Sequence, residues 1–120
     1  MDNSQGRSKE LEERTIKFSL QIIRLVKPLP ETSENRIIKT QLIRSATGIG
    51  ANYTEANNAA SRLDFRNKIF IAKKEAAETR YWLRLLQEAN ENFSCHNEID
   101  EVSQLLFILQ KIISTLKNGK

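Results

Sequence analysis

Proline and glycine, the residues that most often interrupt regular structure, are scarce in this chain of 120 residues. The prolines are Pro28 and Pro30, and the glycines are Gly6, Gly48, Gly50 and Gly119. Because proline inside a helix removes a hydrogen bond and clashes with the preceding turn, this scarcity leaves most of the chain free to be helical. No segment alternates apolar and polar residues for long enough to predict a strand, so we expect an all-α protein.

The sequence also predicts no internal disulfide and no membrane-spanning segment. The single cysteine, Cys95, has no partner for an internal disulfide. No apolar run approaches the roughly 20 residues that cross a bilayer, and the polar first residues lack the apolar core of an export signal. We therefore expect a cytoplasmic protein with no membrane partner.

Catalytic and metal-binding patterns are absent as well. Carboxylate-bridged metal bundles use Glu-x-x-His motifs on separate helices, but the only histidine, His96, falls in a predicted loop. Glu75 and Glu78 are one helical turn apart without a histidine beside them. We expect no catalytic residue, no metal and no cofactor. A metal or small-molecule enzyme housed in a bundle is the weakest of three functional hypotheses.

Apolar residues recur at spacings of three and four in four segments, which predicts helices over 9–27, 33–59, 62–91 and 97–117. The inner lines are Leu11, Thr15, Phe18, Ile22 and Leu25; Ile38, Leu42, Ser45, Ile49, Asn52, Ala56 and Ala59; Phe65, Ile69, Ala72, Ala76, Thr79, Leu83 and Leu86; and Ile99, Val102, Leu106, Leu109, Ile113 and Leu116. Short corners make consecutive helices antiparallel neighbours. We predict an up-down-up-down four-helix bundle over 9–117, a flexible tail over 1–8 and a short tail over 118–120.

Helix starts carry capping residues. Thr32 or Ser33 can cap the second helix, and Ser61 with Asp64 resembles a capping box at the third. Ser94 or Asn97 is the expected cap of the fourth helix.

Three helices carry more apolar residues than a single bundle needs. In the third, Phe70, Ile71, Tyr81 and Leu85 fall away from the inner line and predict an interface between copies of the chain. Second lines on the other two helices are Ile16, Leu20, Ile23 and Val26, and Leu105, Phe107, Ile108 and Ile112. We expect a homo-oligomer; the alternative is a wide internal seam without a partner.

A set of polar residues lies on or beside the inner lines of the second and third helices: Arg44, Asn52, Glu55, Glu75 and Glu78. Pairing about the corner near residue 60 places Arg44 opposite Glu78. A partly buried pair of this kind fixes register, and the alternative is a pore or ligand role. Gly48 and Gly50 each cost about 1 kcal/mol relative to alanine in a helix, which indicates close helix contact or a local kink.

The net charge is +4, and its excess cations lie mainly on the first and third helices. Candidate phosphate contacts are Lys17, Arg24, Lys27, Arg62, Arg66, Lys73 and Lys74. Nucleic-acid binding is one interpretation of this pattern, and a solvated surface of mixed charge is the other.

Three motifs carry a family resemblance: Arg44-Ser-Ala-Thr-x-Ile-x-Ala-Asn-x-x-Glu-Ala56, Asp64-Phe65 and Ile71-Ala-x-Lys-Glu-Ala-x-Glu-Thr-x-Tyr-Trp-Leu83. Over about residues 10–117 the chain resembles the four-helix proteins encoded in intervening sequences of large-subunit ribosomal RNA genes. A related branch is the accessory protein of diversity-generating retroelements. The resemblance implies a homopentameric ring with a narrow channel. In the retroelement branch it implies binding of RNA and a reverse transcriptase through the basic outer surface.

The leading hypothesis is a non-enzymatic, oligomeric protein that binds RNA or a nucleoprotein partner through Lys and Arg contacts to phosphates. The alternative is a protein–protein interaction scaffold that does not bind nucleic acid. Expected partners are further copies of the chain, RNA, and a reverse transcriptase or another protein.

Overall fold

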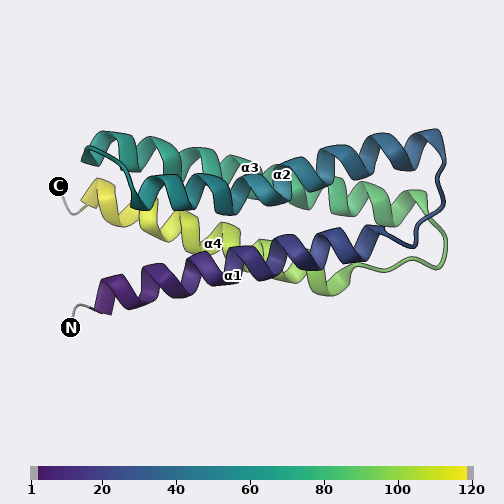
Figure 1. The fold of residues 1–120 in the computed structure, drawn as a ribbon, viewed down its shortest axis with the longest axis horizontal. Helices are drawn as coiled ribbons and strands as arrows, with labels where there is room; N and C mark the ends of the chain where they lie inside the picture. The colour runs from purple at the N-terminus through teal and green to yellow at the C-terminus, as the bar shows by residue number, and fades with distance from the viewer. Residues whose placement is uncertain (1–2, 119–120) are drawn as a thin grey trace.

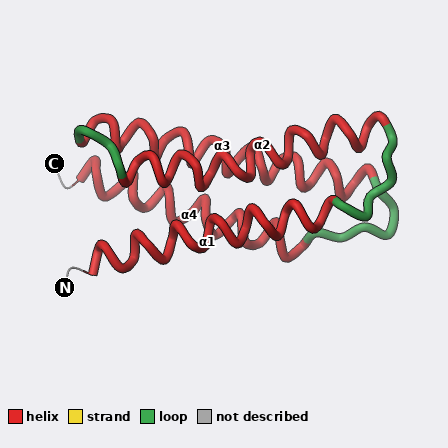
Figure 2. Tube along the Cα trace, in the orientation of Figure 1, coloured by secondary structure: helices red, strands yellow, loops and turns green. Residues whose placement is uncertain are grey.

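The computed structural model describes residues 3–118, which form four α-helices and no strand within that range (Figures 1 and 2). The helices are α1 (Asn3–Val26), α2 (Ser33–Asn57), α3 (Arg62–Ala89) and α4 (His96–Asn118). The all-α prediction is confirmed, and each helix end lies within about two residues of its predicted position except the start of α1. None of the described helices combines the length and the apolar character needed to cross a membrane.

The start of α1 differs from the prediction. Residues 3–8, which we expected in a flexible tail, belong to the helix. Contacts with α2 stabilise this end, because Ser8 Oγ lies 3.2 Å from Tyr53 Oη and Asn57 Nδ2 donates to Glu12 Oε2 at 2.7 Å. Residues 1–2 and 119–120 of the two expected tails lie outside the described residues.

The helices form a rod with extents of 48 × 24 × 21 Å. The contact between α2 and α3 is the most extensive; α3 also packs on α4, and α1 packs on α2. The contact between α1 and α4 is the smallest of the four. In Figure 1 these two helices diverge toward the end of the rod that carries both termini.

The helix starts follow capping chemistry at two of the three corners. Thr32 Oγ1 accepts from the Asn35 backbone at 3.1 Å, and Ser61 Oγ accepts from the Asp64 backbone at 3.0 Å. The expectation of a Ser94 or Asn97 cap is wrong. The Ile99 N–H donates the first helical hydrogen bond of α4 to the Cys95 carbonyl at 2.9 Å. The Cys95 N–H donates to Gln87 Oε1 at 2.7 Å.

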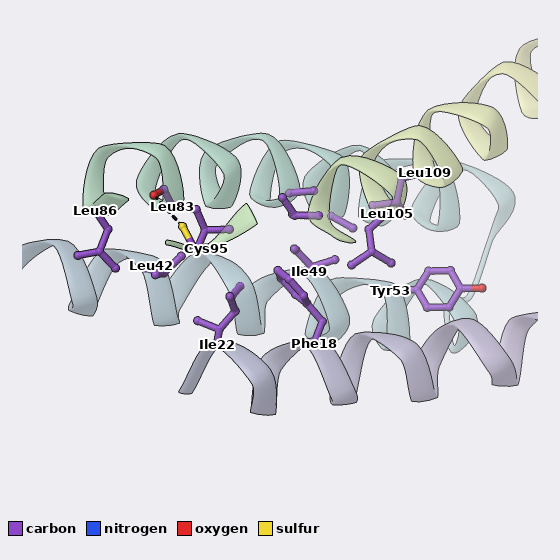
Figure 3. Close-up of a cluster of buried hydrophobic side chains, with 14 of the residues drawn as sticks. Phe18, Ile22, Leu42, Ile49, Tyr53, Leu83, Leu86, Cys95, Leu105 and Leu109 are labelled. Atoms are coloured by element: carbon purple, nitrogen blue, oxygen red, sulfur yellow. Dashed lines mark hydrogen bonds between the residues drawn. The ribbon is translucent and has the colours of Figure 1, made fainter. Parts of the chain in front are cut away.

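The core lies on the predicted inner lines, most completely on α3, whose line from Ile69 to Leu86 is buried. Figure 3 shows side chains from all four helices meeting in this core. Val26 and Leu105 correct the prediction: we assigned both to outer lines, but they are only 4% and 1% exposed. Tyr53 is buried too, and its hydroxyl points away from the other labelled side chains in Figure 3.

Both glycines within α2 lie at close contacts with neighbouring helices, and α2 runs unbroken through them. A Cβ atom at Gly50 would lie 2.6 Å from Thr15 Oγ1 on α1, whereas a Cβ atom at Gly48 would lie 3.2 Å from Glu75 Cδ on α3. The two glycines therefore admit side chains from the two neighbours of α2.

Candidate functional surfaces

The predicted interface residues lie together on the outer face of α3. Phe70, Ile71, Tyr81 and Leu85 are 36%, 37%, 59% and 37% exposed in the single chain. At 100° per residue they fall within an arc of about 100°, opposite the buried line of the same helix. We call this set the α3 apolar arc. Exposed apolar side chains gathered on one face of a helix are typical of a surface that another protein covers.

A row of cations runs beside the α3 apolar arc, on the flank of α3 that faces α4. It consists of Arg62, Arg66, Lys73, Arg80 and Arg84. Spacings of four and seven residues nearly complete whole helical turns, so these positions share an arc of about 40°. Arg80 Nη1 donates to Ser103 Oγ of α4 at 3.4 Å, which places the row at the α3–α4 groove. We call this set the α3 basic row.

The charges of the α3 basic row are not neutralised locally. Within residues 3–118, none of its five side chains forms an ion pair with a carboxylate; the recorded pairs use Arg14, Lys39, Arg44 and Lys68. The Arg66 guanidinium lies 5.4 Å from the centre of the Phe70 ring, which joins the row to the α3 apolar arc. A cation row of this kind attracts a polyanion.

The other predicted phosphate contacts lie elsewhere. Lys74 is exposed on the outer face of α3, whereas Lys17 and Arg24 border a shallow surface hollow with Glu98 at the α1–α4 groove. Lys27 is exposed just after the end of α1. Because α4 packs between α1 and α3, the seven residues do not form one patch.

Two members of the α3 basic row, Arg80 and Arg84, count among the cations of the predicted third helix but not among the seven selected phosphate contacts. Their signal was present, because the row is spaced by four, seven, seven and four residues along one helix. A count of cations per segment does not show that these residues share one side of the helix, whereas a helical projection does.

The polar residues predicted on α2 and α3 form two ion-pair groups, one around Arg44 and one around Glu55. Arg44 Nη2 donates to Glu78 Oε2 at 2.6 Å, and its Nη1 lies 3.5 Å from Glu75 Oε1. Arg44 is 49% exposed, but Glu75 is only 14% exposed, so the pair reaches from the surface into the α2–α3 seam. Asn52 Nδ2 donates to the Gly48 carbonyl of its own helix at 2.8 Å.

Glu55 belongs to the second group. Its Oε1 lies 2.7 Å from Lys68 Nζ on α3. The hydrogen bond to Glu55 raises the pKa of the Lys68 ammonium, because it stabilises the charged form.

Side chains that could hold a metal do not gather among the described residues, where no group of three or more His, Cys, Asp or Glu is suitably placed. Cys95 is buried, and its thiol donates to the Leu83 carbonyl at 3.3 Å, as Figure 3 shows. Burial raises the pKa of the Cys95 thiol to about 11, with a further contribution from Glu98. A thiol in this state is a poor nucleophile near neutral pH.

Comparison with known proteins identifies relatives of this chain. A sequence model of a family described as 23S rRNA-intervening sequence protein matches residues 7–115. A crystal structure from Bacteroides thetaiotaomicron, of a protein with unknown function from the S23 ribosomal protein family, is 34% identical with a TM-score of 0.79. The match covers 90% of this chain and 98% of that one. No curated protein matches the sequence.

Proposed function

This chain belongs to the 23S rRNA-intervening sequence protein family, and from that premise we propose that it is a non-enzymatic, self-associating protein that binds RNA through α3. The α3 basic row carries the RNA-binding part of the proposal, because its five cations have no described carboxylate partner. From Arg62 to Arg84 the row extends over about 33 Å at the rise of an α-helix. Contacts with phosphates along such a row would be weakly specific for sequence and strongly dependent on salt.

The proposal includes assembly. The α3 apolar arc supports self-association, because exposed apolar side chains on one helix face are removed from water when another copy covers them. We propose an up-down-up-down bundle repeated five times around a narrow channel, as the resemblance of the sequence implies. Repetition of the α3 basic row around a ring would add to the affinity for RNA through multiple attachment. We place the protein in the cytoplasm.

The test of RNA binding is a filter-binding salt titration with structured RNA, for the wild type and the triple variant Arg62→Gln/Lys73→Gln/Arg84→Gln. We expect the wild type to bind at about 50 mM salt and to lose affinity steeply as salt rises. For each chain that contacts the RNA, losing three phosphate contacts should make the log–log salt slope shallower by about 2–3.

The matched control is the triple variant Arg36→Gln/Lys39→Gln/Lys68→Gln, which removes the same charge away from the row. It should retain nearly the wild-type slope. Absence of wild-type binding at about 50 mM salt would contradict the proposal, and so would equal losses in the two triple variants.

A second candidate function is a protein interaction scaffold, favoured by the exposure of Tyr81 and Leu85 beside the row. The partner would be a reverse transcriptase or another protein seated on the α3 apolar arc. Stable self-association without RNA binding would favour this candidate over the first.

A further inference from the structure

Figure 1 shows α1 and α4 diverging near the end of the rod that carries both termini. Residues of both helices line an apolar cleft there. Its volume is about 650 Å³, within the range of small-molecule sites. Leu11, Phe65, Ile108 and Ile112 supply apolar surface from three helices. Toward the middle of the rod the cleft is bounded by Arg14, whose Nε donates to Glu101 Oε2 at 2.7 Å. Removal of this apolar surface from water would favour the binding of an apolar group in the cleft.

The cleft also carries an unmatched cation. Arg7 lines it and is one turn before Leu11, so it continues the inner line that leads to Phe18. Among the described residues, Arg7 forms no ion pair. Glu10 also lines the cleft, about 60° away from Arg7 around the helix, and the charge of Arg14 is balanced by Glu101. Arg7 is exposed, and an exposed guanidinium beside an apolar cleft is complementary to an anion that has an apolar body.

Hydroxyl groups add a second recognition element. Ser8 Oγ and Tyr53 Oη are 3.2 Å apart at the wall of the cleft, and either can be the donor. Two hydroxyls that share one hydrogen bond retain one O–H hydrogen for another acceptor. Tyr53 is buried, so its ring holds this pair in place.

We propose that the cleft binds a small amphiphile with a hydrocarbon body and a single carboxylate. The hydrocarbon packs between Ile108, Ile112 and Phe65, and the carboxylate accepts from Arg7 and from the remaining hydroxyl hydrogen of the Ser8–Tyr53 pair. This site is independent of the α3 basic row, which lies on the other side of α4, so either can be correct without the other.

The test is a titration of the isotope-labelled full chain with octanoate, followed by NMR. We expect saturable shifts around Leu11, Tyr53 and Ile112. The dissociation constant should be about 0.1–1 mM, because most methylenes of octanoate become buried. Hexanoate should bind about fifteenfold more weakly, since each buried methylene changes affinity about fourfold. Octan-1-ol, which lacks the charge, should bind about tenfold more weakly than octanoate.

Two exposed residues of α1 give a matched pair of variants. Arg7→Gln should weaken octanoate about tenfold and leave octan-1-ol unchanged, whereas Lys9→Gln, which removes the same charge outside the cleft, should change neither. Ile112→Trp, which fills the cleft, should abolish the shifts with both probes.

Three results would overturn the proposal. The first is no saturable shift at about 10 mM octanoate. The second is equal affinity for octanoate and octan-1-ol. The third is a reduced assembly mass in Ile112→Trp without octanoate binding in the wild type, because a second copy of the chain would then occupy the cleft.

Discussion

Gly48 and Gly50 are two residues apart on α2, but each leaves space for a side chain from a different neighbouring helix. Gly50 faces Thr15 on α1, where both Cβ and Oγ1 of a buried side chain lie within 3 Å of the position an alanine methyl would take. Thr15 cannot easily turn away, because its Oγ1 donates to the Glu12 carbonyl at 2.6 Å. Gly48 faces only the carboxylate end of Glu75, which is flexible.

This difference predicts opposite effects of the same substitution. Gly50→Ala should lower the free energy of unfolding by about 1–3 kcal/mol, because overpacking outweighs the gain in helix propensity. Gly48→Ala should leave the free energy of unfolding unchanged or raise it by up to about 1 kcal/mol, because Glu75 can move. Urea unfolding of the two variants measures both values. A Gly50→Ala protein as stable as Gly48→Ala would refute the close contact between α1 and α2.

Among the elements, α2 and α3 form the best-defined pair. Hydrogen bonds mark their register at several points. Thr79 Oγ1 donates to Ser45 Oγ at 2.8 Å, and Asn35 Nδ2 donates to Oδ1 of Asn90, the residue just after α3, at 3.0 Å. Arg44 joins the same helices from the surface through Glu75 and Glu78. A pair that reaches a mostly buried carboxylate contributes more to register than an exposed ion pair does.

Arg44→Ala should therefore lower the free energy of unfolding by about 1–2 kcal/mol, because Glu75 is left in the seam without its cation. Adding Glu75→Gln to that variant should restore part of the loss, since a neutral amide costs less to bury. Lys68→Ala removes a more exposed pair and should lower the free energy of unfolding less than Arg44→Ala does. Thermal unfolding followed by circular dichroism tests this order, and an Arg44→Ala protein as stable as the wild type would contradict it.

The helices themselves could be predicted from local chemistry. Spacings of three and four marked each inner line, and two prolines and the capping residues Thr32 and Ser61 marked the corners. The early start of α1 could not be predicted, because it depends on contacts of Ser8 and Glu12 with a helix far along the chain. Val26 and Leu105 were misplaced for a similar reason: periodicity gives the apolar side of a helix but not the width that its neighbours cover.

For the whole molecule, sequence reasoning identified the residues of the α3 apolar arc but saw only part of the α3 basic row. The cleft between α1 and α4 could not be predicted from the sequence, because the divergence of two helices depends on their packing and leaves no periodic pattern of residues. Arg7 shows the limit clearly. Its place on the inner line of α1 has meaning only once the helix is known to extend that far.

The proposed assembly is the property on which the account of the whole molecule depends, because it would hide the α3 apolar arc and repeat the α3 basic row. Replacing Tyr81 and Leu85 by aspartate should place charge on the arc and disfavour association, while the buried line of α3 is untouched. Such a variant should fold and keep its helical content.

The most direct test is multi-angle light scattering of the purified wild-type chain at micromolar concentration, beside the Tyr81→Asp/Leu85→Asp variant. The account predicts a wild-type mass near 69 kDa, five times the 13.8 kDa of one chain, and a smaller mass for the variant. A wild-type mass of 13.8 kDa would contradict the account, because Phe70, Ile71, Tyr81 and Leu85 would then face water in the native protein.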